Sequence, residues 1–286
     1  MPVRDLPPPF RAPFNGHDGR LLTLLVLAGL GLRVWAYAAN VSLWLDEILL
    51  SRNIIRLPLD ALLTGPLYLD QVAPRGFLLL EKVAVMTFGG NELALRLPPF
   101  LAGIAGLLLF RRLAARALDG WAVVFAVALY ALAIPFIRYG AEVKQYEFDG
   151  TVAILVTLLA LDMWERDLST ARLLVVALVG FAVTWISQAS VLVLAGIGLA
   201  TTIRWLTARD PRSRRALVLV MPVWAAAATI AVAVGRYSMT PSTSAFMDDF
   251  WKRGFFPLPL RASTALVWTW DTALSPFTDP VLLRYR

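Results

Sequence analysis

The sequence predicts an all-α integral membrane protein that crosses the bilayer several times and carries interfacial helices in long outer loops. Hydrophobic residues make up 58% of the 286 residues and charged residues only 16%, whereas an average soluble domain is about half apolar and about a quarter charged. The mean hydropathy is +0.66. Apolar stretches that approach the length of about 20 residues needed to cross a bilayer recur along the chain. The chain has no cysteine, which excludes disulfides and thiolate metal sites.

Seven apolar stretches are predicted to span the membrane, and the shorter ones need a locally thinned bilayer. They lie at about residues 21–39, 97–110, 121–137, 151–164, 173–186, 189–203 and 216–234.

The segments outside these spans complete the predicted organisation. Residues 1–20 form a Pro-rich tail, and no small-residue cleavage site follows the first span. That span is therefore expected to be a retained anchor, and residues 21–286 to form a single membrane domain. Gly76–Phe88 is too short to span and contains Glu81 and Lys82, so we expect a helix lying in the interface.

The distribution of basic residues predicts the orientation. Lys and Arg are about twofold denser in the tail and the other segments on its side than in segments 40–96, 138–149 and 235–261. The N-terminus is therefore expected in the cytoplasm, and these three segments are expected to be outer loops of a multi-pass protein in the plasma or inner membrane. The net charge of +7 indicates contact with lipid head groups rather than nucleic acid, because the basic residues form no continuous stripe.

A pair of adjacent carboxylates, Asp46 and Glu47, follows the first span in the sequence SLWLDEILL. Such a pair suits a general base or a cation site, because like charges and partial burial shift the pKa of at least one member. The alternative is that both acids end the helix in solvent.

A second cluster lies in RYGAEVKQYEFDG, residues 138–150, between two predicted spans. If this segment is helical, Glu142, Tyr146 and Asp149 share one face and Lys144 points elsewhere. Ionisable groups at a membrane surface are functional candidates. A charged loop held by internal salt bridges, Arg138 included, is the alternative.

Two arginines near the spans allow two readings each. Arg33 lies inside the first span, where it either snorkels or lines a polar cavity. Arg96 immediately precedes the second span, where it suits either a bound phosphate or lipid head groups.

Taken together, the ordered blocks LWLDE, QVAPRGFLLLEKVAVMTFGGNELALRLPPFLAG and RYGAEVKQYEFD resemble one family. It is the lipid-phosphate-dependent glycosyltransferases of the protein O-mannosyltransferase and aminoarabinose transferase type (glycosyltransferase family 39, GT-C fold). The resemblance covers about residues 20–165 well and the remainder only in hydropathy. It implies a GT-C-type multi-span helical bundle.

The resemblance also implies an activity and the residues that carry it. Such enzymes move a sugar from a polyprenyl-phosphate carrier to a protein, lipid or glycan acceptor on the outer face of the membrane. The role of the catalytic acid in the first outer loop falls on Asp46, with Glu47 as its neighbour. The second-loop acid corresponds to Asp149, with Glu142 as the competing choice. Arg96 matches the family arginine before the second span.

The chemistry of sugar transfer assigns further roles. A base must deprotonate the acceptor hydroxyl, and cations must hold the departing phosphate. Asp46 is the expected base. The expected substrate-binding residues are Arg96, Lys144, Glu142, Tyr146 and Arg138. A divalent metal is left open, because acid pairs also bind Mg²⁺ or Mn²⁺.

Two departures from the family leave other readings open. Ala73-Pro74-Arg75 stands where many members have two prolines. The family has roughly twice this span content, so we expect the chain to be a fragment, and an inactive truncated member is one alternative. A transporter subunit is the other, although it would place ionisable residues near the middle of several spans.

Overall fold

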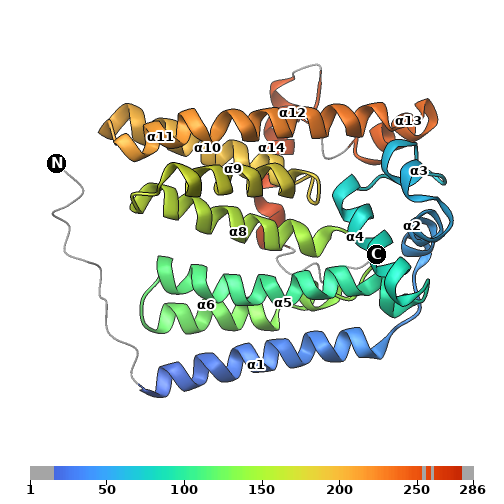
Figure 1. Cartoon of the computed structure of the whole chain (residues 1–286), viewed down its shortest axis with the longest axis horizontal. Coiled ribbons are helices and arrows are strands. Elements are labelled where there is room, and N and C mark those ends of the chain that lie inside the picture. The colour runs from blue at the N-terminus through green and yellow to red at the C-terminus, as the bar shows by residue number, and fades with distance from the viewer. Residues whose placement is uncertain (1–15, 253–255, 259–260, 279–286) are drawn as a thin grey trace.

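The computed structural model describes residues 16–252, 256–258 and 261–278, and all regular elements in these residues are helices (Figure 1). The helices are α1 (Gly16–Ala39), α2 (Leu45–Arg56), α3 (Leu59–Thr64), α4 (Arg75–Phe88), α5 (Glu92–Ala117), α6 (Trp121–Leu132), α7 (Ile134–Tyr139), α8 (Tyr146–Glu165), α9 (Thr170–Thr184), α10 (Ser190–Ala208), α11 (Pro211–Leu219), α12 (Met221–Tyr237), α13 (Pro241–Phe250) and α14 (Ala262–Thr278).

Within the described residues, four stretches are long and apolar enough to cross a membrane. They are Gly19–Ala39, Glu92–Ala117, Ser190–Ala208 and Pro211–Tyr237, and Trp121–Leu132 and Thr170–Thr184 are shorter apolar helices. Large apolar side chains such as Leu178 and Leu192 are exposed on these helices, as a lipid-facing surface requires. The fold is therefore all-α and indicates a multi-pass membrane protein, in agreement with the coarse sequence prediction.

The long helices pack into two groups that share α8. On one side, α8 packs along α5, and α1 packs against α5 and α6. On the other side, α8 contributes to a core with α9, α10, α11 and α12. Because it belongs to both cores, α8 fixes the two groups relative to each other.

A third, smaller core lies at one end of the bundle, where α2, α3 and α4 gather (Figure 1). Two cations of α4 tie these short helices together. Lys82 donates to the carbonyls of Ile54 and Leu57 at the end of α2, at 2.8 and 2.7 Å. Arg75 donates to the carbonyls of Leu62 and Gly65 at the end of α3, at 2.7 and 2.6 Å. Cations favour helix C-termini, so these bonds hold the connected segment in place.

Some predicted boundaries differ from the structure. Helix α1 begins at Gly16, within the predicted tail, of which residues 1–15 lie outside the described residues. The stretch predicted as one span at 121–137 forms α6 and α7, because Pro135 begins a new helix after the extended residue Ala133. The predicted loop 235–261 contains α13, whose first turn is capped by Thr240.

The packing of α9 against α12 provides a test of the fold. A Cβ atom at Gly180 would lie 1.9 Å from Nε1 of the buried Trp224. We expect Gly180→Ala to lower the free energy of unfolding by roughly 1–3 kcal/mol through overpacking, measured by unfolding in detergent. The matched control is Gly196→Ala on α10, where a Cβ meets nothing within 4 Å. Equal loss of stability in both variants would contradict this packing.

Candidate functional site

The acid pair lies in the first turn of α2, where the helix dipole favours negative charge. The two side chains nevertheless have different surroundings. Glu47 is buried, with 2% of its side chain exposed, whereas 32% of the Asp46 side chain is exposed. Of the two acids, Asp46 has the more accessible side chain.

The buried carboxylate of Glu47 joins separate parts of the chain. Its Oε1 accepts a hydrogen bond from the backbone N–H of Val143 at 2.8 Å, and its Oε2 accepts one from Trp44 at 3.1 Å. Arg96 Nη2 lies 3.7 Å from Oε1, and Arg96 Nη1 donates to Asn40 Oδ1 at 3.1 Å. Glu47 thereby holds α2 against the start of α5 and against the segment after α7.

Asp46 belongs to a group of three polar side chains. Lys144 Nζ lies 2.6 Å from Asp46 Oδ2. Gln71 Nε2 donates to Asp46 Oδ1 at 3.1 Å, and Lys144 Nζ donates to Gln71 Oε1 at 3.3 Å. Lys144 and Gln71 are buried, so together they orient a carboxylate whose remaining surface is accessible.

Two more predicted site residues lie in the same segment. Arg138 donates through Nε to Glu142 Oε1. Burial raises the pKa of Glu142, and the charge of Arg138 opposes this rise. Burial, with the negative charge of Asp46 adding to it, raises the pKa of Tyr146 to about 12. The hydroxyl of Tyr146 therefore stays protonated at neutral pH.

A shared face of Glu142, Tyr146 and Asp149 required a continuous helix, and this condition is not met. Residues 140–145 form turns, and α8 begins only at Tyr146. This turn directs Lys144 toward Asp46 instead of away from it. Asp149 accepts its hydrogen bond from Ser187 Oγ, at 2.6 Å, in the connection between α9 and α10.

A cavity of about 680 Å³ opens beside Glu47, between the end of α1 and α7; we call it the α1–α7 cavity. Its wall is mostly apolar and includes the exposed Trp35 and Ile134. Its charged lining residues are Glu47, Arg96, Arg138 and Glu142. The cavity therefore combines an apolar body with a charged end.

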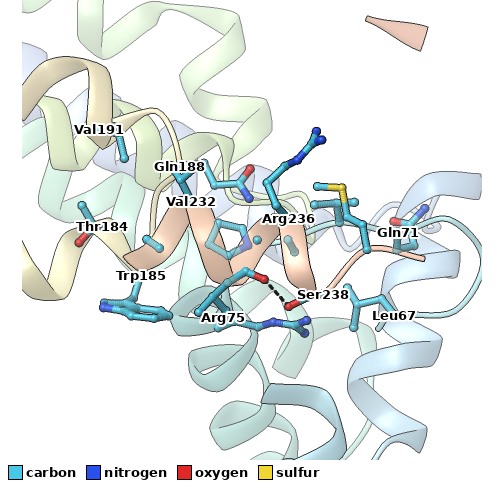
Figure 2. A pocket seen from close by; sticks show the side chains of 17 residues that line it. Leu67, Gln71, Arg75, Thr184, Trp185, Gln188, Val191, Val232, Arg236 and Ser238 are labelled. Atoms are coloured by element: carbon cyan, nitrogen blue, oxygen red, sulfur yellow. Dashed lines mark hydrogen bonds between the residues drawn. The ribbon is translucent and has the colours of Figure 1, made fainter. Parts of the chain in front are cut away.

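A smaller pocket of about 220 Å³ lies among the first turn of α4, the α9–α10 connection and the end of α12 (Figure 2); we call it the α4–α12 pocket. Gln71 lines it, and the same side chain is bonded to Asp46. Gln71 thus belongs both to the Asp46 group and to the lining of the α4–α12 pocket. Glu47, the next residue after Asp46, lines the α1–α7 cavity.

Sequence reasoning missed the buried polar side chains Gln71 and Glu147, and it left two readings of Arg33 open. Gln71 carries no distinguishing signal in a loop. Arg33 does not snorkel: it is 1% exposed and donates to the carbonyls of Gly29 and Ala131, both at 3.1 Å. Glu147 is fully buried, without a hydrogen-bond partner for either carboxylate oxygen.

The sequence predicts that Glu81 lies on an interfacial helix, but no sequence pattern predicts that its side chain is buried. Its side chain is 0% exposed, and neither carboxylate oxygen has a hydrogen-bond partner. Burial raises the pKa of Glu81 well above its ordinary value.

In the part of the chain that the structure describes, no three His, Asp or Glu side chains are placed to hold a metal ion. Comparison of the chain with protein-family models, curated proteins and solved structures finds no match.

The role of Glu47 as an anchor can be tested by Glu47→Gln. The amide keeps the shape of the side chain, but its NH₂ group faces one backbone N–H, and Arg96 loses its counter-ion. We expect a loss of about 2–4 kcal/mol in unfolding free energy and faster proteolysis of segment 40–96, measured in detergent. Asp60→Asn at an exposed position of α3 is the control. Wild-type stability of the Glu47 variant would refute the anchor.

Proposed function

We propose that the chain is a membrane glycosyltransferase that moves a sugar from a polyprenyl-phosphate donor to an acceptor on the outer face of the cell membrane. The observation that carries this proposal is the α1–α7 cavity, an apolar space whose charged lining residues include Arg96, Arg138 and Glu47, the sequence neighbour of the accessible Asp46. A polyprenyl chain needs an apolar space that opens toward lipid, and its phosphate needs cations at the end of that space.

The proposed step has a simple balance of bonds and protons. The acceptor hydroxyl oxygen attacks the anomeric carbon, and the bond from that carbon to the phosphate oxygen breaks. Asp46 takes the hydroxyl proton as general base. The polyprenyl phosphate leaves with the bonding electron pair, and the guanidinium groups of Arg96 and Arg138 stabilise its charge.

The remaining residues have supporting roles in this proposal. Lys144 and Gln71 orient Asp46, and Glu47 positions Arg96 and the Lys144 segment. Glu142 pairs with Arg138, and Tyr146 offers a protonated hydroxyl close to Asp46. Asp149 stays a prediction from the family resemblance. The GT-C-type bundle and the cytoplasmic N-terminus also belong to the proposal.

A transporter subunit is the second candidate, because Arg33 and Glu147 are both buried between the long helices. Ionisable groups inside a bundle often mark a path for ions or substrates. Flux into vesicles without any release of sugar from a lipid carrier would favour this function over a transferase.

Replacing Asp46 is the first test of the enzyme. Membranes containing the wild type or Asp46→Asn receive a panel of radiolabelled polyprenyl-phosphate sugars, and the label released from the carrier is counted. We expect turnover to fall by about 10²–10⁴-fold at unchanged abundance, because the amide is no base. Asp60→Asn, an exposed acid near the site in sequence, should keep full turnover.

The other outcomes of this experiment are equally decisive. Equal turnover of wild type and Asp46→Asn would remove Asp46 from the mechanism. No turnover by either chain across the panel would favour an inactive member of the family.

The donor site can be tested by filling the α1–α7 cavity. Ala36 on α1 lines this cavity, and a tryptophan there would occupy the space proposed for the carrier. We expect Ala36→Trp to raise KM for the polyprenyl-phosphate sugar by about tenfold or more, because the bound carrier loses apolar contact. Ala28→Trp, at an exposed position of the same helix outside the cavity, is the control. Equal KM in both variants would argue against a donor in this cavity.

A further inference from the structure

The lining of the α4–α12 pocket has an uneven distribution of charge. None of the described residues that line it is acidic, whereas two are arginines, Arg75 and Arg236. The amides of Gln71 and Gln188 and the hydroxyls of Thr184 and Ser238 complete its polar surface. Such a lining attracts a ligand that carries hydroxyl groups and negative charge, and its described residues offer no carboxylate to a cation.

A close backbone contact joins two of the elements that line this pocket. The backbone N–H of Gly76 donates to the carbonyl of Trp185 at 2.6 Å, and a Cβ atom at Gly76 would also lie 2.6 Å from that oxygen. Only glycine allows α4 to approach the α9–α10 connection this closely. Arg75, the neighbouring residue, lines the pocket, and its bonds to the end of α3 hold its guanidinium in place.

The second cation comes from another element. Arg236 lies near the end of α12, whereas Arg75 begins α4, and both arginines line the pocket (Figure 2). It is exposed to solvent, unlike Arg75. A flexible, exposed guanidinium at the rim can close on an anion that enters the pocket, with two parallel hydrogen bonds.

Gln71 connects the pocket to the proposed base. Its side chain lines the pocket, while its Nε2 donates to Asp46 Oδ1 at 3.1 Å. A ligand seated in the pocket therefore contacts a side chain that is itself bonded to Asp46. The volume of about 220 Å³ is below the usual range of roughly 300–1,000 Å³ for small-molecule sites. This size fits a single sugar unit or a small head group.

We infer that the α4–α12 pocket binds the acceptor, and that this acceptor is a hydroxylated molecule bearing a phosphate or carboxylate. Its anionic group pairs with Arg236, and a hydroxyl group faces Asp46. This inference rests on the proposed transferase activity, and it adds the chemical class of the acceptor. The anionic acceptor is either water-soluble or the head group of a lipid, since Val232 and Val234 of α12 give the pocket one apolar wall.

The test compares pairs of acceptors that differ only in charge. The probes are a methyl glycoside and its phosphate monoester, and a dodecyl glycoside and its phosphate monoester. Binding to the full chain in lipid nanodiscs is measured in the Asp46→Asn background, where no turnover interferes, and KM for transfer is measured in the wild type. We expect each phosphorylated probe to bind about tenfold more tightly than its neutral partner. Tighter binding of the dodecyl pair would identify the acceptor as a lipid head group. Equal binding of the methyl and dodecyl phosphates would identify it as a water-soluble molecule.

Variants of two exposed arginines test whether the preference for phosphorylated probes arises in the α4–α12 pocket. Arg236→Gln should abolish most of the preference for the phosphorylated probes, while Arg172→Gln, at an exposed position of α9 outside the pocket, should retain it. Equal binding of charged and neutral probes would overturn the inference, as would a preference that Arg236→Gln leaves intact.

The two proposals fail separately. Transfer to neutral and phosphorylated probes with equal KM would keep the transferase and refute the anionic acceptor. An Arg236-dependent preference in binding, without transfer from any lipid carrier, would keep the anion site and refute the transferase.

Discussion

The arrangement of the site depends on the hydrogen bond between the buried carboxylate of Glu47 and the backbone N–H of Val143. Residues 140–145 are turns without a helical hydrogen-bond ladder of their own, so their position depends on contacts with other elements. Glu47 supplies one such contact and also attracts Arg96. Since Lys144 follows Val143 directly, the same bond brings its ammonium group to Asp46. An uncompensated carboxylate at this buried position would be costly, and its partners remove that cost.

The bundle accepts buried polar side chains because small residues let helices approach closely. A Cβ atom at Gly103 would lie 3.1 Å from Glu147 Oε1, and one at Gly106 would lie 2.5 Å from Thr151 Oγ1. Glycine at these positions of α5 gives α8 the space to place Glu147 and Thr151 in the interface. Helices in membranes commonly pack through such small residues. Glu147 and Thr151 of α8 therefore point inward, where lipid cannot reach them.

Sequence patterns predicted the fold class because length and continuous hydropathy determine whether a helix can span a bilayer. They singled out Asp46, Glu47, Arg96 and Lys144 among other candidate site residues, and the structure places Lys144 beside Asp46 and Arg96 beside Glu47. They did not predict the turn at 140–145, since its backbone is held by long-range contacts. Gln71 and Glu147 were also beyond sequence reasoning, because a single glutamine in a loop, or one more acid in a charged segment, has no local signal.

Adjacent acids in a helix point about 100° apart, and this simple geometry gives Asp46 and Glu47 separate tasks. Once Glu47 faces the turn at 140–145, Asp46 has to face the loop that carries Gln71. Burial then makes one carboxylate structural and leaves the other accessible, although the sequence presents them as equivalent. The orientation of Asp46 relative to the two cavities depends on the position of the first turn of α2. A neighbouring acid that anchors this turn is therefore more useful to such a base than a second reactive acid. The pair is therefore best understood as one accessible group and the support that positions it.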